Sequence, residues 1–330
     1  MIFSKDNGIS KDNGNFVLFL CAFSLCASVA KAEVYELLDG SGDLVGAIST
    51  VYSTYEDTFI EIGRPHNLGF EELRNANPQV DPWLPGEGTE IVLPTEFILP
   101  QVDRQGIVIN VAEYRIYYFF SIDGKDFVST VPASIGRMDW STPIGLTGIV
   151  AKVHKPSWYP PESVRREYAE EGRELPRVVP PGPENPLGDY ALRLGLPGYL
   201  IHGTNRPAGV GMRVTHGCIR LFPEDIEWIF PRVSKRTPVR IINQPLKFGW
   251  RGDDLFLEAH PQLEQNAEEG NDGPGLTLIT REYVKATREQ AADVDWELIA
   301  RTYKAQTGMP VKVGSRASTA VQEELLSQAE

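Results

Sequence analysis

Short apolar segments, each ended by proline or glycine, limit this chain to a small set of folds. Four of them, rich in β-branched and aromatic residues, span residues 106–111, 115–120, 127–135 and 144–153. Runs of this kind are typical of β-strands, and 25 prolines and 30 glycines can supply the turns between them. With 330 residues the chain is long enough to bury a sizeable core. The sequence therefore predicts a mostly β fold with a β-sandwich or barrel-like core.

Residues 1–32 have the pattern of a secretory signal peptide. Lys5 and Lys11 precede an apolar run over residues 16–30, and a small-x-small cleavage site follows at residues 30–32. The run is shorter than the roughly 20 residues that span a bilayer as a helix. We therefore expect export, cleavage after residue 32 and no stable membrane insertion of the mature chain. An uncleaved anchor is the alternative.

Residues 43–99 are predicted to form a small α+β module. A helical pattern at residues 68–73 is stopped by proline, and a strand at residues 89–93 follows. Together with the Asp57-Thr58 pair, this strand–helix–helix–strand order resembles a LysM domain, a family that binds glycans containing N-acetylglucosamine. The glycine that usually precedes the Asp-Thr pair is absent. The resemblance implies glycan binding, and a module that serves only for packing is the alternative.

Two further segments differ in composition from the predicted strands. Residues 155–185 are rich in proline and charge, with a helical stretch near residues 161–171. Such an excursion is typical of a lid or binding loop, and structural decoration is the alternative. The C-terminal extension, residues 249–330, has a polar linker at residues 264–275 and one or two amphipathic helices at residues 280–305. We expect a short helical tail there.

Cys218 is the residue most in need of an explanation. Cleavage after residue 32 would remove the other two of the three cysteines, and exported proteins usually pair their thiols in disulfides. A small buried hydrophobe or an intermolecular disulfide would account for it. The neighbouring sequence favours chemistry, because two of the five histidines, His202 and His216, lie within 16 residues of the cysteine and each precedes a glycine.

The Thr-His-Gly-Cys sequence at residues 215–218 has the residue types of an activated thiol. A cysteine attacks as the thiolate, and a neighbouring imidazole can accept its proton. His216 precedes Cys218 by two residues, so on an extended strand both side chains would project from the same face. Gly217 between them leaves room for the amides of Gly217 and Cys218 to donate hydrogen bonds to an oxyanion.

A zinc site built from His202, His216 and Cys218 is the rival chemical interpretation, because histidine and cysteine are the usual zinc ligands. The sequence has no second mature cysteine and no H-E-x-x-H pattern, so we expect no metal and no cofactor. The formal net charge of −13 also argues against phosphate-mediated binding, so no nucleic-acid partner is expected.

The two histidine segments, Ile-His-Gly-Thr-Asn at residues 201–205 and Thr-His-Gly-Cys-Ile-Arg-Leu at residues 215–221, resemble the YkuD-type L,D-transpeptidases. The likeness is to the ErfK/YbiS/YcfS/YnhG branch of Gram-negative bacteria and includes the LysM-like module. It implies a catalytic domain over residues 103–244 and a periplasmic location. It further implies Cys218 as nucleophile, His216 as general base, Gly217 as the backbone element beside them, and His202, Gly203, Asn205 and Arg220 as substrate-binding residues.

The same resemblance implies the reaction and its partners. Cys218 would attack the bond between meso-diaminopimelate and D-alanine in a tetrapeptide stem of peptidoglycan, and an amine would resolve the thioester. That amine is the C-terminal lysine of the outer-membrane lipoprotein or the diaminopimelate of another stem. Water as acceptor would give a carboxypeptidase or a lipoprotein-releasing hydrolase. The rival from another class is a non-catalytic wall-binding protein. Many family members have asparagine two residues after the cysteine, where this chain has Arg220.

Overall fold

The computed structural model describes residues 32–38, 40, 42–137, 140–263 and 274–317. Its centre is a nine-stranded mixed sheet, which confirms the predicted mostly β fold. In spatial order its strands are β1 (Glu33–Leu37), β8 (Lys125–Pro132), β7 (Arg115–Ile122), β6 (Gly106–Asn110), β15 (Pro238–Ile242), β10 (Gly145–His154), β11 (Tyr190–Leu194), β12 (Leu200–His202) and β14 (Ile219–Arg220). The predicted signal peptide lies outside the described residues, apart from Ala32.

Both faces of the central strands are buried, which explains their nearly continuous apolar sequence. On β6, Ile107 and Ile109 belong to one core, which also contains Ile226 of helix α4 (Pro223–Arg232). Val108, between them, points to the opposite face and packs into a second core with Phe59. The two-residue alternation of a strand thus places one core on each side of the sheet.

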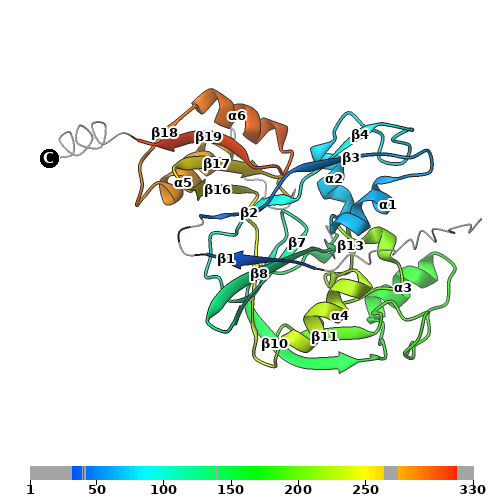
Figure 1. Cartoon of the computed structure of the whole chain (residues 1–330). Coiled ribbons are helices and arrows are strands. Elements are labelled where there is room, and N and C mark those ends of the chain that lie inside the picture. Colours follow the sequence, from blue (N-terminus) through cyan, green and yellow to red (C-terminus); the bar gives the residue numbers. More distant parts are fainter. Residues whose placement is uncertain (1–31, 39, 41, 138–139, 264–273, 318–330) are drawn as a thin grey trace, which may run out of the picture.

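The second core joins the sheet to residues 43–99, the segment predicted to be a LysM-like module, which lies against the sheet (Figure 1). Its antiparallel pairs are β2 with β5 and β3 with β4. Its elements are β2 (Leu44–Gly46), β3 (Ser49–Tyr52), α1 (Phe59–Gly63), η1 (Arg64–His66), α2 (Phe70–Ala76), β4 (Glu90–Leu93) and β5 (Glu96–Ile98). Thr58 caps α1 in a capping box with Glu61, and Gly69 with Glu72 begins α2. Strand β1, outside the predicted 103–244 range, pairs with β8 of the main sheet.

The C-terminal extension is more than the predicted helical tail. It contains helices α5 (Pro274–Ala286) and α6 (Trp296–Ala305), and also a four-stranded sheet that sequence analysis did not predict. Its strands are β16 (Leu246–Arg251), β17 (Asp254–Ala259), β19 (Val311–Arg316) and β18 (Ala292–Val294). The Gly252-Asp253 pair between β16 and β17 is a hairpin signal that could have revealed the first two strands. Most of the predicted linker, residues 264–273, lies outside the described residues.

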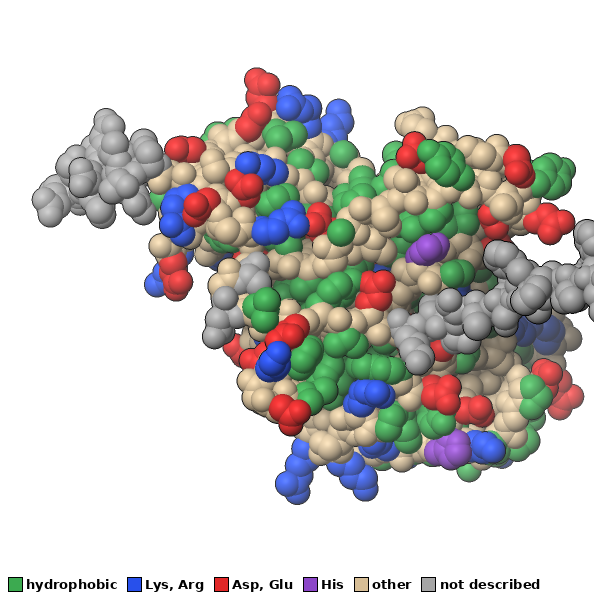
Figure 2. Space-filling model, viewed as in Figure 1, with side chains coloured by type: hydrophobic (Ala, Val, Ile, Leu, Met, Phe, Trp, Pro, Cys, Tyr) green, Lys and Arg blue, Asp and Glu red, His purple; other side chains and the backbone are tan. Residues whose placement is uncertain are grey.

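In Figure 1 the LysM-like module and the C-terminal region lie side by side above the main sheet, and α3 (Glu162–Glu170) and α4 lie at its other end. The short parallel pair β9 (Ile135–Gly136) with β13 (Arg213–Thr215) and the turn η3 (Pro207–Gly209) complete the fold. Acidic and basic side chains are interspersed over the face in Figure 2. Within the described residues, no helix has the length and apolar character needed to cross a membrane.

Candidate active site

Cys218 faces a cleft of about 810 Å³ at the end of the main sheet. The cleft is bounded by the strands β11 and β12 on one side and by the proline-rich excursion on the other. Its lining includes Trp158, Tyr159, Val164, Tyr199, His202 and Arg220. Trp158, Tyr159 and Tyr199 give the cleft flat apolar walls, and a few polar groups lie among them, as in most ligand sites.

Strand pairing fixes the position of the predicted residues. Strands β12 and β14 are parallel, and their register places His202 opposite Arg220. The backbone of Arg220 also exchanges two hydrogen bonds with Ser134. Just before β14, Thr215 Oγ1 donates to the carbonyl of Cys218 at 2.6 Å, and Thr142 Oγ1 donates to the carbonyl of Gly217 at 3.1 Å. The segment that carries the thiol is therefore held by two side chains.

The local backbone differs from the expectation of an extended strand over residues 216–218. These three residues form a bend between β13 and β14, and Gly217 has a φ of +97°. This left-handed region favours glycine, because a side chain there clashes with the backbone. Strand alternation therefore does not place His216 and Cys218 on one face. Within the described residues, the amides of Gly217 and Cys218 donate to no protein acceptor.

The Cys218 thiol is half-buried and contacts the carbonyl oxygen of Gly198 at 3.6 Å. Burial raises the pKa of this thiol above its ordinary value, although the amide of Leu200 and the charge of Arg220 act in the opposite direction. The resting thiol is therefore protonated at neutral pH. Attack through this sulfur requires a base that removes its proton.

The His216 imidazole makes its hydrogen bond with a residue that sequence analysis did not single out. Its Nε2 lies 2.7 Å from Oε2 of Glu167, on helix α3. The Trp140 ring packs against it in a T-shaped arrangement, with ring centroids 5.5 Å apart. Within the described residues the imidazole is not hydrogen bonded to Cys218. Glu167 lies 49 residues before His216, and no local pattern marks it.

The remaining predicted residues divide between two hollows. His202 and Arg220 line the cleft with Cys218. Gly203 and Asn205 line a neighbouring hollow of about 650 Å³, and the Asn205 amide donates to the Pro183 carbonyl at 3.1 Å. The structure therefore does not bring Asn205 into the cysteine cleft. In Arg220, Nε is buried and has no hydrogen-bond partner among the described residues.

His202 is held neutral. Its Nδ1 lies 2.6 Å from the carbonyl oxygen of Gly203, and burial, followed by the charge of Arg220, lowers its pKa to about 4. The unfolded chain therefore binds a proton at His202 between about pH 6.5 and pH 4 that the folded chain does not. The contribution of neutral His202 to the free energy of unfolding is therefore complete above the unfolded-state pKa of about 6.5 and is lost as the pH falls to the folded-state pKa of about 4.

We expect His202→Gln to flatten this pH dependence. Between pH 7 and pH 4 the free energy of unfolding of the parent should fall by about 3 kcal/mol more than that of the variant. Denaturant titrations at several pH values measure the difference. Burial raises the pKa of Asp225 to about 8, so Asp225 changes the free energy of unfolding with pH in the opposite direction. This effect is the same in the parent and the variant. Parallel curves would contradict the assignment.

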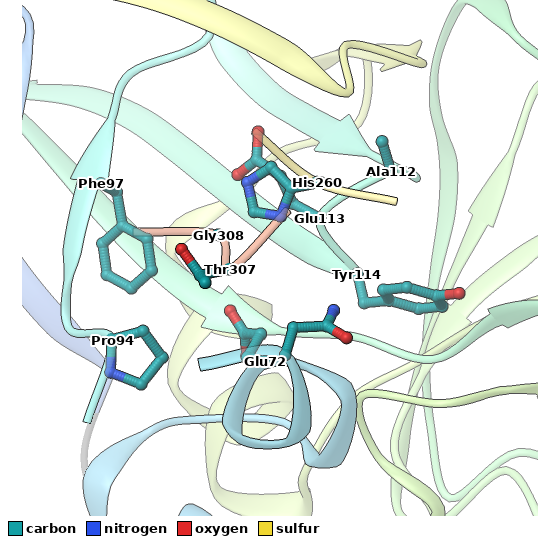
Figure 3. Close-up of a pocket in the computed structure, with 10 residues that line it drawn as sticks. Glu72, Pro94, Phe97, Ala112, Glu113, Tyr114, His260, Thr307 and Gly308 are labelled. Carbon is teal, nitrogen blue, oxygen red and sulfur yellow. The ribbon is translucent and has the colours of Figure 1, made fainter. Parts of the chain in front are cut away.

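The residues proposed for a zinc site, His202, His216 and Cys218, line the same cleft, but in the described part of the chain their ligand atoms do not lie together at metal-binding distance. The cluster of potential ligands found there lies elsewhere, at Glu113, Glu258 and His260. The ammonium of Lys247 lies 2.7 Å from Glu113 and 2.8 Å from Glu258 and already supplies the positive charge. Glu113 and His260 of this cluster also line the pocket in Figure 3, at the junction where residues 43–99, the β6–β7 turn and the C-terminal region meet.

Sequence comparisons with known proteins identify the family of the chain. Residues 104–241 match the family model of the L,D-transpeptidase catalytic domain, YkuD, which defines the class of the chain. A protein of Escherichia coli K12 named "Probable L,D-transpeptidase YcfS" is 38% identical over 90% of this chain and 93% of its own length. The Salmonella typhimurium protein "Probable L,D-transpeptidase ErfK/SrfK" is 37% identical over 91% and 95%. The solved catalytic domain of an Enterococcus faecium L,D-transpeptidase is 21% identical, with a TM-score of 0.33. The match covers 43% of the present chain and 100% of the solved domain.

The chain belongs to the L,D-transpeptidase family, in the branch that includes ErfK, YbiS and YcfS. The relatives named above match it over nearly their full lengths, so the likeness covers the LysM-like module and the C-terminal region as well as the catalytic domain.

Proposed function

We propose that the protein is a peptidoglycan L,D-transpeptidase that transfers an acyl group through a thioester on Cys218. Family membership supports the reaction class. The observation that carries the proposal is the thiol that lines the cleft, next to two backbone amides that have no acceptor among the described residues and an imidazole two residues away. A cysteine buried only for packing would not need such neighbours.

The chemistry follows from these groups. His216 takes the thiol proton as Cys218 Sγ attacks the carbonyl between meso-diaminopimelate and D-alanine, and the amides of Gly217 and Cys218 stabilise the oxyanion. The C–N bond then breaks, and the proton passes from His216 to the departing D-alanine amine. An acceptor amine attacks the thioester, gives its proton to His216 and restores the thiol. Catalytic hydrogen bonds that are loose without substrate often form only when it binds.

Arg220 is the cation best placed to bind a substrate carboxylate. It is largely buried and lines the cleft with Cys218, and its Nε has no acceptor within the described part of the chain. Burial lowers the pKa of Arg220, as expected for a cation without a full set of partners. Peptidoglycan stems carry carboxylates, which guanidinium groups recognise through paired hydrogen bonds. We assign Arg220 to substrate positioning on this ground.

The LysM-like module supports binding to the glycan part of the wall. Tyr55, Trp83 and Leu84 are exposed in loops next to α1 and before β4, with 81%, 53% and 76% of their surfaces accessible. Exposed aromatic side chains of this kind can stack on sugar rings. Wall binding would then hold the enzyme near its substrate, and it is also the function that would remain if Cys218 were not catalytic.

The acceptor is identified by mass spectrometry. Residues 33–330 are incubated with wall fragments bearing tetrapeptides, with or without a lysine-terminated lipoprotein peptide. A lipoprotein–stem conjugate, a stem–stem cross-link or a free tripeptide reports the lysine, the diaminopimelate amine or water as acceptor. Release of D-alanine in any arm supports the proposal. Wall binding without release of D-alanine would favour the non-catalytic alternative.

Gly217→Ala tests whether the backbone conformation at residue 217 is needed for activity. An added Cβ would lie 2.8 Å from Cε1 of Tyr199, at a φ that L-residues rarely adopt. We expect D-alanine release to fall about 100-fold, because the oxyanion donors move. Gly124→Ala is the matched control, since Gly124 has a φ of +78° but open space around it. Equal rates for the two variants would contradict the role of Gly217.

A further inference from the structure

We propose that the LysM-like module, residues 43–99, positions the segment that carries Cys218, because it holds the loop that leads into that segment. This loop, residues 207–212, runs from η3 to β13, and the bend at residues 216–218 comes immediately after that strand. The module thereby has a role in catalysis besides wall binding. This role rests on the proposed function for its effect on activity.

The module and the loop meet through a close approach of two backbones. Gly69 directly precedes α2, and a Cβ added to Gly69 would lie 2.6 Å from Cα of Gly211 in the loop. The atom in the way belongs to the backbone, so it cannot rotate aside as a flexible side chain would. The amide of Glu71 also donates to the carbonyl of Gly211 at 3.2 Å. A shift of the module is therefore transmitted directly to the loop.

The side chain of Met212, the last residue of the loop, adds an apolar contact. It packs against the second core, to which α2 contributes Phe70 and Leu73. The carbonyl of Met212 accepts from the amide of Ile135, in β9, at 3.2 Å. Met212 is thus held by the module on one side and by a strand next to the cleft on the other. The residue after it begins β13.

The start of α2 is itself fixed on the main sheet. Oε1 of Glu72 lies 2.6 Å from Nε of Arg115, whose side chain has no exposed surface. Oε2 of Glu72 accepts from the amide of Gly69 at 2.6 Å, and Arg115 donates to the carbonyl of Asn67 at 2.8 Å. Buried polar networks whose members are all hydrogen bonded make the groups that they join rigid. A continuous set of contacts therefore runs from β7 through Gly69 to the loop.

Ser134 ties the loop to the strand that follows Cys218. Its Oγ donates to the carbonyl of Gly209 at 2.7 Å, and its backbone exchanges two hydrogen bonds with Arg220. The bend with the thiol lies between these two attachment points. A displacement of about 1 Å at a reacting atom can lower the rate 100-fold. We therefore expect activity to depend on how the loop is seated on the module.

Gly69→Ala tests this dependence with a single methyl group. Gly69 has a φ of −87°, which alanine adopts without strain, so the substitution acts through packing, with Cα of Gly211 as the nearest atom. We expect kcat for D-alanine release to fall 10- to 100-fold. KM should change less than about threefold, because most of the cleft wall comes from residues 150–202.

Gly88→Ala is the matched control for Gly69→Ala. Gly88 belongs to the same module and has a φ of +73°, but nothing lies within 4 Å of the position of an added Cβ. The substitution therefore strains the module without touching the loop. It should keep the parent kcat.

Met212→Ala is a milder variant that weakens the same contact without a clash. It removes the apolar contact between the loop and the second core, and we expect kcat to fall about 3- to 10-fold. Met309→Ala makes the same change at a half-buried methionine of the C-terminal region and should keep the parent kcat. Circular dichroism and thermal unfolding verify that all four variants fold.

Hydrogen exchange reports on the loop without any substrate. In Gly69→Ala the amides of residues 207–215 should exchange at least about tenfold faster than in the parent, while those of β6 and β7 keep their rates. In Gly88→Ala the exchange of residues 207–215 should not change. Mass spectrometry of peptic peptides measures these rates.

Three results would overturn the proposal: parent kcat in Gly69→Ala and Met212→Ala, equal losses in these variants and their controls, or a fall in kcat without faster exchange of the loop. Failure of the proposed function has a different signature. If Cys218→Ala still releases D-alanine, the thiol is not the nucleophile, but the exchange rates still decide whether the module holds the loop. If Cys218→Ala is inactive while Gly69→Ala behaves like Gly88→Ala, only the role of the module is wrong.

Discussion

Cys218→Ala is expected to lower D-alanine release by about 10⁴-fold or more while leaving the protein folded. The substitution removes the one thiol among the described residues, to which we assign the thioester, and loss of a nucleophile has effects of this order. The thiol is half-buried, and its neighbours are the carbonyl of Gly198 at 3.6 Å and the amide of Leu200, so the free energy of unfolding should change by less than about 1 kcal/mol. Chromatography of released D-alanine and thermal unfolding of the same samples measure the two quantities.

Wall binding provides the control for this variant. The LysM-like module lies on the other face of the sheet from the core next to the cleft, so Cys218→Ala should bind wall fragments as the parent does. Lost binding together with lost activity would indicate a folding defect. Release of D-alanine at the parent rate would show that the cysteine has no part in the reaction.

Lys247→Met is expected to give the largest loss of stability, about 3–5 kcal/mol. Lys247 has no exposed surface, and its ammonium lies between the buried carboxylates of Glu113 and Glu258. Although burial opposes it, the charges of Lys247 and His260 keep the pKa of Glu258 below its ordinary value. Removing the cation leaves two buried carboxylates without their shared ammonium, although His260 still contacts Glu258, and breaking a buried ion pair in this way costs far more than the pair contributes. Denaturant titration followed by circular dichroism measures the loss.

Lys312→Met is the matched control for Lys247→Met. Lys312 lies in the same C-terminal sheet and pairs with Asp254 at 2.7 Å, but both side chains are about half exposed. Exposed pairs contribute at most about 1 kcal/mol. Similar losses for the two variants would show that the buried network at the junction in Figure 3 does not join the three regions.

The sequence predicted the elements whose signals are local. The apolar segments at residues 106–111 and 115–120 became β6 and β7, because strands buried on both faces need continuous apolar residues. It also placed Cys218 and His216 in one short segment, and the structure puts the thiol of that segment in a cleft.

The parts that were missed depend on contacts between distant residues. Glu167 reaches His216 from 49 residues away, and its helix looks like an ordinary charged surface helix in sequence. The bend at Gly217 could not be distinguished from a strand, because glycine is compatible with both. The pairing of β1 with β8 joins segments about 90 residues apart, beyond any periodicity signal.

Trapping the acyl-enzyme tests the central claim most directly. The protein is mixed with tetrapeptide stems without an acceptor amine, quenched in acid within seconds and digested for mass spectrometry. The account predicts that the peptide containing Cys218 gains the mass of the stem minus D-alanine, and that hydroxylamine removes this mass. Release of D-alanine with the Cys218 peptide unmodified at every time point, or with the mass on another residue, would contradict it.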